Sequence, residues 1–65
     1  MYREPALSVV TIGYESAADC HMVVGELARQ TEASEIEVIL VAPDREGISD
    51  DYIETFGAWQ WVTMP

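Results

Sequence analysis

The feature that most constrains this chain is a short apolar run, residues 36–44, which reads Ile-Glu-Val-Ile-Leu-Val-Ala-Pro-Asp and is followed at once by charged residues. Alternate residues of a strand point to opposite faces, so Val38 and Leu40 share one face. Ile39 and Val41 share the other. Because both faces are apolar, the run is typical of a strand buried on both sides in a parallel sheet, which needs cover above and below.

The size and charge of the chain limit what it can be. Its 65 residues can form one small domain, and a domain of this size buries only about 60% of its unfolded surface. Twelve acidic residues against three Arg, with no Lys, give a net charge of −9. This charge repels a phosphate backbone and an anionic membrane, so we expect neither nucleic-acid binding nor membrane attachment.

The same composition predicts a cytoplasmic protein. A single Cys cannot form an internal disulfide, which fits a reducing compartment. No apolar segment approaches the ~20 residues that span a bilayer, and residues 1–5 lack the apolar core of a signal peptide.

The first half of the chain predicts a lead-in, a strand and a helix. Residues 1–6 are polar and lack periodicity, whereas residues 7–12 are β-branched and apolar, as in a strand. Ser16 is a good N-cap for a helix over residues 17–30, and Asp19 can bond the amides of its first turn. The apolar stripe of this helix consists of Ala17, Cys20, Val23, Val24, Leu27 and Ala28.

The second half repeats the pattern. Ser49 is an N-cap signal, Asp50 and Asp51 suit the first turn of a second helix, and Gly57 ends it. Residues 58–64 alternate well enough to form a third strand. The buried side of the second helix is predicted to comprise Ile48, Tyr52, Ile53 and Phe56.

Strand, helix, strand, helix and strand in this order make two crossover units of an α/β fold. Right-handed crossovers progressing in one direction give a three-stranded parallel sheet, order 1-2-3, with both helices on one face. Consecutive residues such as Val9 and Val10 leave aliphatic groups on the other face, each forgoing roughly 1.5–3 kcal/mol in water. We expect residues 7–65 to be a single βαβαβ unit that is the amino-terminal part of a larger domain, or that self-associates through its uncovered face.

Ligands of open α/β sheets bind beyond the carboxyl ends of the strands. At these ends Ile12 and Gly13 offer backbone, Tyr14 offers a ring on which a base can stack, and Asp44 offers an acceptor for a ribose hydroxyl or a ring N–H. Each has a structural alternative. Gly13 can simply relieve a turn, Tyr14 can cover the top of the core, and Asp44 with Arg45 can form a solvated loop.

Several other chemistries are not supported. No Gly-x-Gly-x-x-Gly follows the first strand, and a chain without Lys has no Walker-type phosphate loop. The adjacent side chains of Cys20 and His21 diverge by about 100° on a helix and cannot share a metal, so we expect core and helix-flank roles for them. Asp50 and Asp51 are better explained as helix-start charges than as a metal pair.

Three stretches in order, Leu-Ser-Val-Val-Thr-Ile-Gly-Tyr-Glu-Ser, Leu-Ala-Arg-Gln-Thr and Ile-Glu-Val-Ile-Leu-Val-Ala-Pro-Asp, resemble the amino-terminal segment of the family 2 nucleotide-sugar glycosyltransferases. That family typically has Ser-Val-Val-Ile-Pro-Thr-Tyr-Asn in its first strand, Gln-Thr at the helix end and Glu-Val-Ile-Val-Val-Asp-Asp-Gly-Ser in its second strand. The similarity covers residues 6–44. It implies an incomplete Rossmann-like nucleotide-binding half of a type A glycosyltransferase fold.

The resemblance implies a half-site for a nucleotide-sugar donor, with Tyr14 against the base and the backbone of Ile12 and Gly13 lining the pocket. The chain departs from the family pattern at the usual Asp pair, where it has Ala-Pro, so that the nearest acid, Asp44, comes one position late. The Asn that normally follows the Tyr is Glu15.

The family's metal-binding motif and catalytic base lie beyond these residues. A divalent metal, Mg or Mn, is therefore expected for the full enzyme, with no cofactor in this segment and no activity from it alone. The alternative is a small acidic α/β interaction module that self-associates through its uncovered sheet face. A phospho-receiver domain fits less well because no acidic pair follows the first strand.

Overall fold

The computed structural model describes residues 7–64 and contains one parallel sheet in the order β1-β2-β3. The lead-in predicted over residues 1–6 and the final Pro65 lie outside the described residues. The strands are β1 (Leu7–Ile12), β2 (Ile36–Ala42) and β3 (Ala58–Thr63). The helical elements are η1 (Ala17–Cys20), α1 (His21–Ala28), η2 (Ala33–Glu35) and α2 (Asp50–Thr55). The predicted α/β unit and its strand order are confirmed.

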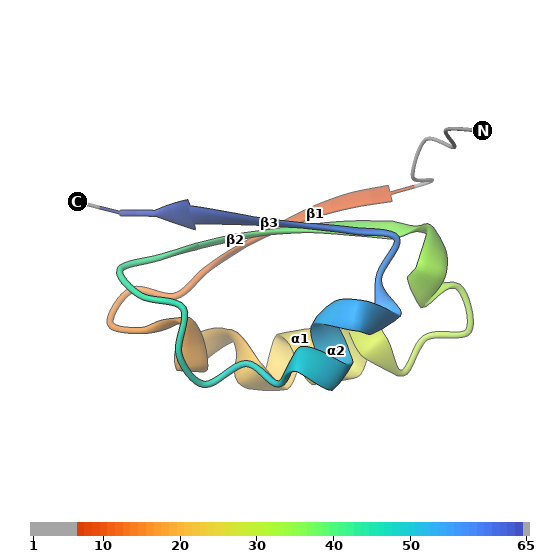
Figure 1. The fold of residues 1–65 in the computed structure, drawn as a ribbon, viewed down its shortest axis with the longest axis horizontal. Coiled ribbons are helices and arrows are strands. Elements are labelled where there is room, and N and C mark those ends of the chain that lie inside the picture. The colour runs from red at the N-terminus through yellow and green to blue at the C-terminus, as the bar shows by residue number, and fades with distance from the viewer. Residues whose placement is uncertain (1–6, 65) are drawn as a thin grey trace.

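Both helices lie on the same face of the sheet, and no described residue covers the opposite face (Figure 1). The core fills the space between the sheet and the helices, where Val24, Val38 and Leu40 are fully buried. Cys20 is also buried, as predicted, and its Sγ accepts a hydrogen bond from Thr11 Oγ1 at 3.2 Å. The remaining buried core residues are Ala17, Ala33, Ile36, Ala42 and Phe56.

Strand β2 is buried on one face only, as expected from two helices on the same side of the sheet. Val38 and Leu40 face the helices and are inaccessible to solvent, whereas Ile39 and Val41 on the other face are half-buried. Neighbouring strands shield their flanks, and nothing in residues 7–64 lies over them. We call this uncovered surface the open face. By strand alternation and register it consists of Ser8, Val10, Ile12, Glu37, Ile39, Val41, Ala58, Gln60 and Val62.

The first helix differs from the continuous helix predicted over residues 17–30. The segment begins as the 3₁₀ turn η1, becomes α-helical at His21 and ends at Ala28. The predicted N-cap is present, since Ser16 Oγ accepts from the Ala18 amide at 3.2 Å. Asp19 Oδ2 accepts from the Ser16 amide at 3.4 Å, and the two residues form a capping box. A 3₁₀ turn is a frequent form of a helix start.

The second crossover follows the prediction more closely. Ser49 Oγ accepts from the Asp51 amide at 3.2 Å and caps α2, while Phe56 is buried. Gly57 lies so close to η2 that a Cβ there would stand 2.3 Å from the Ser34 carbonyl oxygen. Only a glycine fits this approach without a backbone shift.

Aromatic rings line the covered side of β3. Trp59 lies between Phe56 and Trp61, with ring centroids 5.8 Å and 5.2 Å away. The guanidinium of Arg45 stands over the Trp61 ring at 5.8 Å from its centroid. The indole N–H of Trp59 is buried and has no acceptor among the described residues.

Candidate functional site

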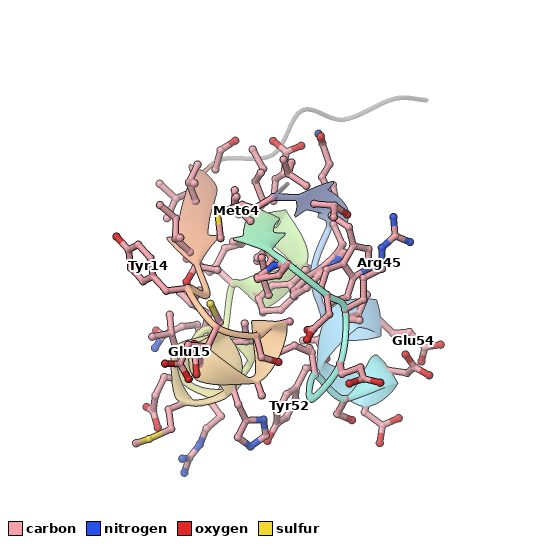
Figure 2. All side chains as sticks on the ribbon, turned by 90° about the vertical axis from the view of Figure 1, so that its left-hand side faces the viewer. Tyr14, Glu15, Arg45, Tyr52, Glu54 and Met64 are labelled. Carbon is pink, nitrogen blue, oxygen red and sulfur yellow. The ribbon has the colours of Figure 1, made fainter. Side chains whose placement is uncertain are left out.

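The predicted ligand surface lies at the carboxyl ends of the three strands. Two backbone hydrogen bonds extend the pairing just beyond the strands, from Gly13 N to Val41 O at 2.8 Å and from Met64 N to Ala42 O at 3.0 Å. Seen from this end, Tyr14 points away from the sheet on one side, with Met64 nearer the centre (Figure 2). The structure therefore brings the three strand ends together as expected.

Asp44 joins the loop after β2 to the start of η1. Its Oδ1 accepts three hydrogen bonds, from Ser16 Oγ at 3.0 Å, the Ala17 amide at 3.0 Å and the Glu46 amide at 3.2 Å. The bond from the Ala17 amide, followed by that from the Glu46 amide, lowers the pKa of the Asp44 carboxyl below its ordinary value. Asp44 is thus held in position by the chain itself, within a loop whose next three residues are exposed to solvent.

The second oxygen of Asp44, Oδ2, accepts no hydrogen bond from any residue between 7 and 64. A carboxylate oxygen has two lone pairs and accepts readily from N–H and O–H donors. The side chain is therefore fixed in orientation by Oδ1 and keeps Oδ2 available for a ligand donor.

Gly13 has a role in the chain itself. It is buried, and a Cβ at this position would stand 2.2 Å from the Ser16 carbonyl oxygen, well inside contact distance. The turn from β1 into η1 therefore requires glycine whether or not a ligand binds nearby. This observation agrees with the structural alternative for Gly13.

Tyr14 does not cover the core, in contrast to its structural alternative. Its side chain is 79% exposed and points outward (Figure 2). Ile12, the residue before the turn, directs its side chain to the open face and is 47% exposed. Tyr14 and Asp44 thus both follow strand ends, Tyr14 in the turn after β1 and Asp44 in the loop after β2.

Sequence reasoning missed the partners of Asp44. Ser16 was identified as an N-cap, and nothing in the sequence linked it to a carboxylate 28 positions away. Gly47, with φ of 90°, packs against Ala18, where a Cβ would stand 2.4 Å from the Ala18 Cβ. This glycine after the Asp44 loop was the available signal that the loop folds back on η1.

Other candidate chemistries find no support in the described part of the chain. Residues 7–64 contain no group of three His, Cys, Asp or Glu side chains able to hold a metal ion. The divalent ion implied by the resemblance therefore has no ligand set here, and we derive no step through it. None of the helices over residues 7–64 has the length and apolarity needed to cross a bilayer.

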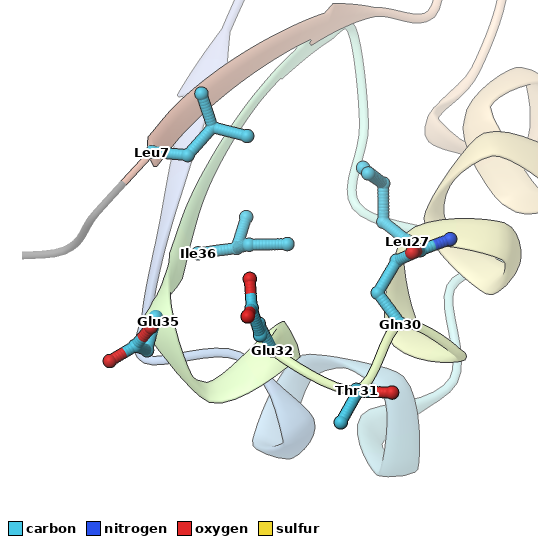
Figure 3. A pocket seen from close by; sticks show the side chains of 7 residues that line it. All are labelled: Leu7, Leu27, Gln30, Thr31, Glu32, Glu35 and Ile36. Carbon is cyan, nitrogen blue, oxygen red and sulfur yellow. The ribbon is translucent and has the colours of Figure 1, made fainter.

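A pocket of about 510 Å³ lies at the opposite end of the sheet, near the amino ends of β1 and β2 (Figure 3). Its apolar lining comes from Leu7, Leu27 and Ile36, and Gln30, Thr31, Glu32 and Glu35 form the polar part. A smaller hollow of about 140 Å³ lies between α1 and Tyr52. Neither includes a residue of the predicted ligand surface.

The comparisons with known proteins identify no relative. No family model, curated protein or solved structure matches this chain. The function must therefore be argued from the geometry at the strand ends and from the exposed surfaces.

Proposed function

We propose that the carboxyl-end surface binds the nucleoside part of a nucleotide-sugar donor, as one half-site of a glycosyltransferase-like domain. The observation that carries the proposal is Asp44, whose Oδ1 is held by three donors while Oδ2 engages none among the described residues. A carboxylate fixed in this way can accept from a ring N–H of a base or from a ribose hydroxyl. Like any solvent-accessible Asp it is charged at neutral pH, and the amide bonds to Oδ1 lower its pKa further.

Tyr14 supplies the second element of the proposed half-site. Its ring is 79% exposed, so a base can reach the π-face without displacing core residues. Stacking of a base on an aromatic side chain is worth about 1–3 kcal/mol. A hydrogen bond from Asp44 would add selectivity among bases.

The charge of the chain argues against a diphosphate site on these residues. A net charge of −9 and the lack of Lys disfavour phosphate binding, so this half-site would hold the nucleoside end of the donor. In the transfer reaction an acceptor oxygen bonds to the anomeric carbon and a nucleoside diphosphate leaves. We assign no residue of this chain to that bond exchange or to the accompanying proton transfer.

An NMR titration with uridine and with uridine diphosphate tests the proposal. We expect amide shifts at Gly13, Tyr14 and Asp44, with uridine at least as effective as the diphosphate in the absence of metal. Asp44→Asn retains an acceptor for the three internal donors and replaces the other oxygen with a donor group, so binding should weaken about tenfold, the effect of one charged hydrogen bond.

Asp51→Asn is the matched control, because Asp51 is an exposed carboxylate in the first turn of α2. It should leave the titration unchanged. A folded sample in which neither ligand moves the resonances of residues 12–14 and 44 would contradict the proposal.

A further inference from the structure

The open face of the sheet has an apolar half and a polar half. Toward the carboxyl ends it presents aliphatic side chains, with Val10 61%, Ile12 47% and Val62 44% exposed. Toward the amino ends Glu37 accepts from Ser8 Oγ and from Gln60 Nε2, each at 2.8 Å. A partner for this face must match both halves.

The polar half is an ordered row across all three strands. Ser8 bonds Glu37 Oε1 and Gln60 bonds Glu37 Oε2, so each carboxylate oxygen accepts one hydrogen bond and retains a second lone pair. Among the described residues, Glu37 is the only charged side chain on the open face, and no described Arg pairs with it. A cationic group above this row could bond a carboxylate that is already fixed in position.

The size of the open face limits the occupant. Three strands about 4.8 Å apart and six residues long, at about 3.3 Å per residue, cover roughly 300 Å². A standard interface buries about 800 Å² on each partner, so this face alone suits a weak contact, and charge rather than area distinguishes a helix from a second copy. One helix about 10 Å wide and roughly 13 residues long matches the dimensions of the face.

Charge disfavours a second copy. A two-fold axis lying in the interface would place the two Glu37 carboxylates opposite each other, or set each against the apolar half of the other copy. Each copy also carries a net charge of −9, so the two repel at long range. The chain has no Lys to offset this repulsion.

We propose that the open face docks an amphipathic helix of a partner protein, with an aliphatic stripe over Val10, Ile39 and Val41 and a Lys or Arg over Glu37. The stripe would remove the aliphatic side chains from water, and the cation would supply the charge that this face lacks. The proposal does not depend on nucleotide binding, because its residues lie on a different surface from Tyr14 and Asp44.

Two helix-constrained peptides of 14 residues test the proposal against the full chain. Both carry the same Leu and Ala stripe, and one has Lys while the other has Glu on its flanks. We expect the Lys peptide to shift the methyl resonances of Val10, Ile39, Val41 and Val62. Its Kd should be at least tenfold below that of the Glu peptide. Glu37→Gln should reduce this difference at least threefold.

Val10→Asp should abolish binding, while Val23→Asp, at a 48% exposed position on α1, should preserve it. Equal affinity for the two peptides, or methyl shifts confined to the helical side, would overturn the proposal. So would a dimer of the free chain in sedimentation that Val10→Asp dissociates, because a second copy would then occupy the face. If the chain binds the Lys peptide but not uridine, the result contradicts only the proposed nucleotide half-site.

Discussion

The two faces of the sheet are made of similar residues and have different environments. Val38 on the covered face is inaccessible to solvent, whereas Val10, in the neighbouring strand and on the open face, is 61% exposed. Both are β-branched and both suit a strand. The difference teaches that strand formation and burial are separate properties in this chain. The helices cover one face of the sheet, and no residue between 7 and 64 covers the other.

The largest effect should come from Leu40→Ala on the covered face. Leu40 is inaccessible, and its truncation leaves a cavity beneath the helices, so unfolding free energy should fall by about 2–5 kcal/mol. Ile39→Ala, one residue along on the open face, should cost only about 1 kcal/mol through lost strand preference. Urea unfolding monitored by circular dichroism measures both. Equal losses would mean that the two faces are equally buried in solution.

The next effect concerns the turn that joins the covered face to the ligand surface. Gly13→Ala would place a Cβ 2.2 Å from the Ser16 carbonyl oxygen, and the resulting backbone shift should cost about 1–3 kcal/mol in thermal unfolding. Gly25→Ala is the control, because its nearest contact, Tyr52 Oη, would be an ordinary 3.5 Å away. That substitution should stabilise α1 by about 0.5–1 kcal/mol.

A smaller, pH-dependent effect should come from Asp44. Its folded pKa lies below the ordinary value of 3.8, so its stabilising contribution is present above that pH and is lost as pH falls through the folded pKa. We expect the decline in melting temperature below pH 4 to be shallower in Asp44→Asn than in the unchanged chain. Asp51→Asn should retain the original slope. Parallel curves for all three proteins would show that the Asp44 bonds do not form.

The smallest effect should come from Val10→Thr on the open face. Threonine keeps the β-branched shape, and a substitution at an exposed position usually changes stability by no more than about 0.5 kcal/mol. The same change should measurably weaken binding of the Lys peptide to the open face, because the threonine hydroxyl would be buried under the docked helix. A large loss of stability in the free chain would mean that this face is already covered.

Local sequence patterns predicted most of the fold. The alternation of Val38 with Ile39 marked β2, and the hydroxyl side chains of Ser16 and Ser49 marked the helix starts, because strand period and capping depend on neighbouring residues. The 3₁₀ start at Ala17 was not predicted, since the apolar spacing of residues 17–30 does not distinguish a 3₁₀ turn from the first turn of an α-helix. The half-burial of Ile39 was predicted by topology rather than by alternation, because two right-handed crossovers place both helices on one face of the sheet.

The candidate site was also predicted only in part, because its tertiary contacts cannot be deduced from local sequence. The position of Asp44 at a strand end follows from topology. Which of its two oxygens is hydrogen-bonded within the chain depends on tertiary contacts with Ser16 and Ala17. Tyr14 was placed at the correct end of the sheet, and its outward orientation could not be deduced from its neighbours in sequence. Whether these residues bind a nucleoside stays a prediction.

The ring cluster on β3 gives the molecule a built-in optical probe. Both tryptophans of the chain belong to this last strand, so intrinsic emission reports its attachment to β2 and is nearly blind to β1. A blue-shifted spectrum that reddens before the circular dichroism signal disappears would reveal the outer strand detaching first.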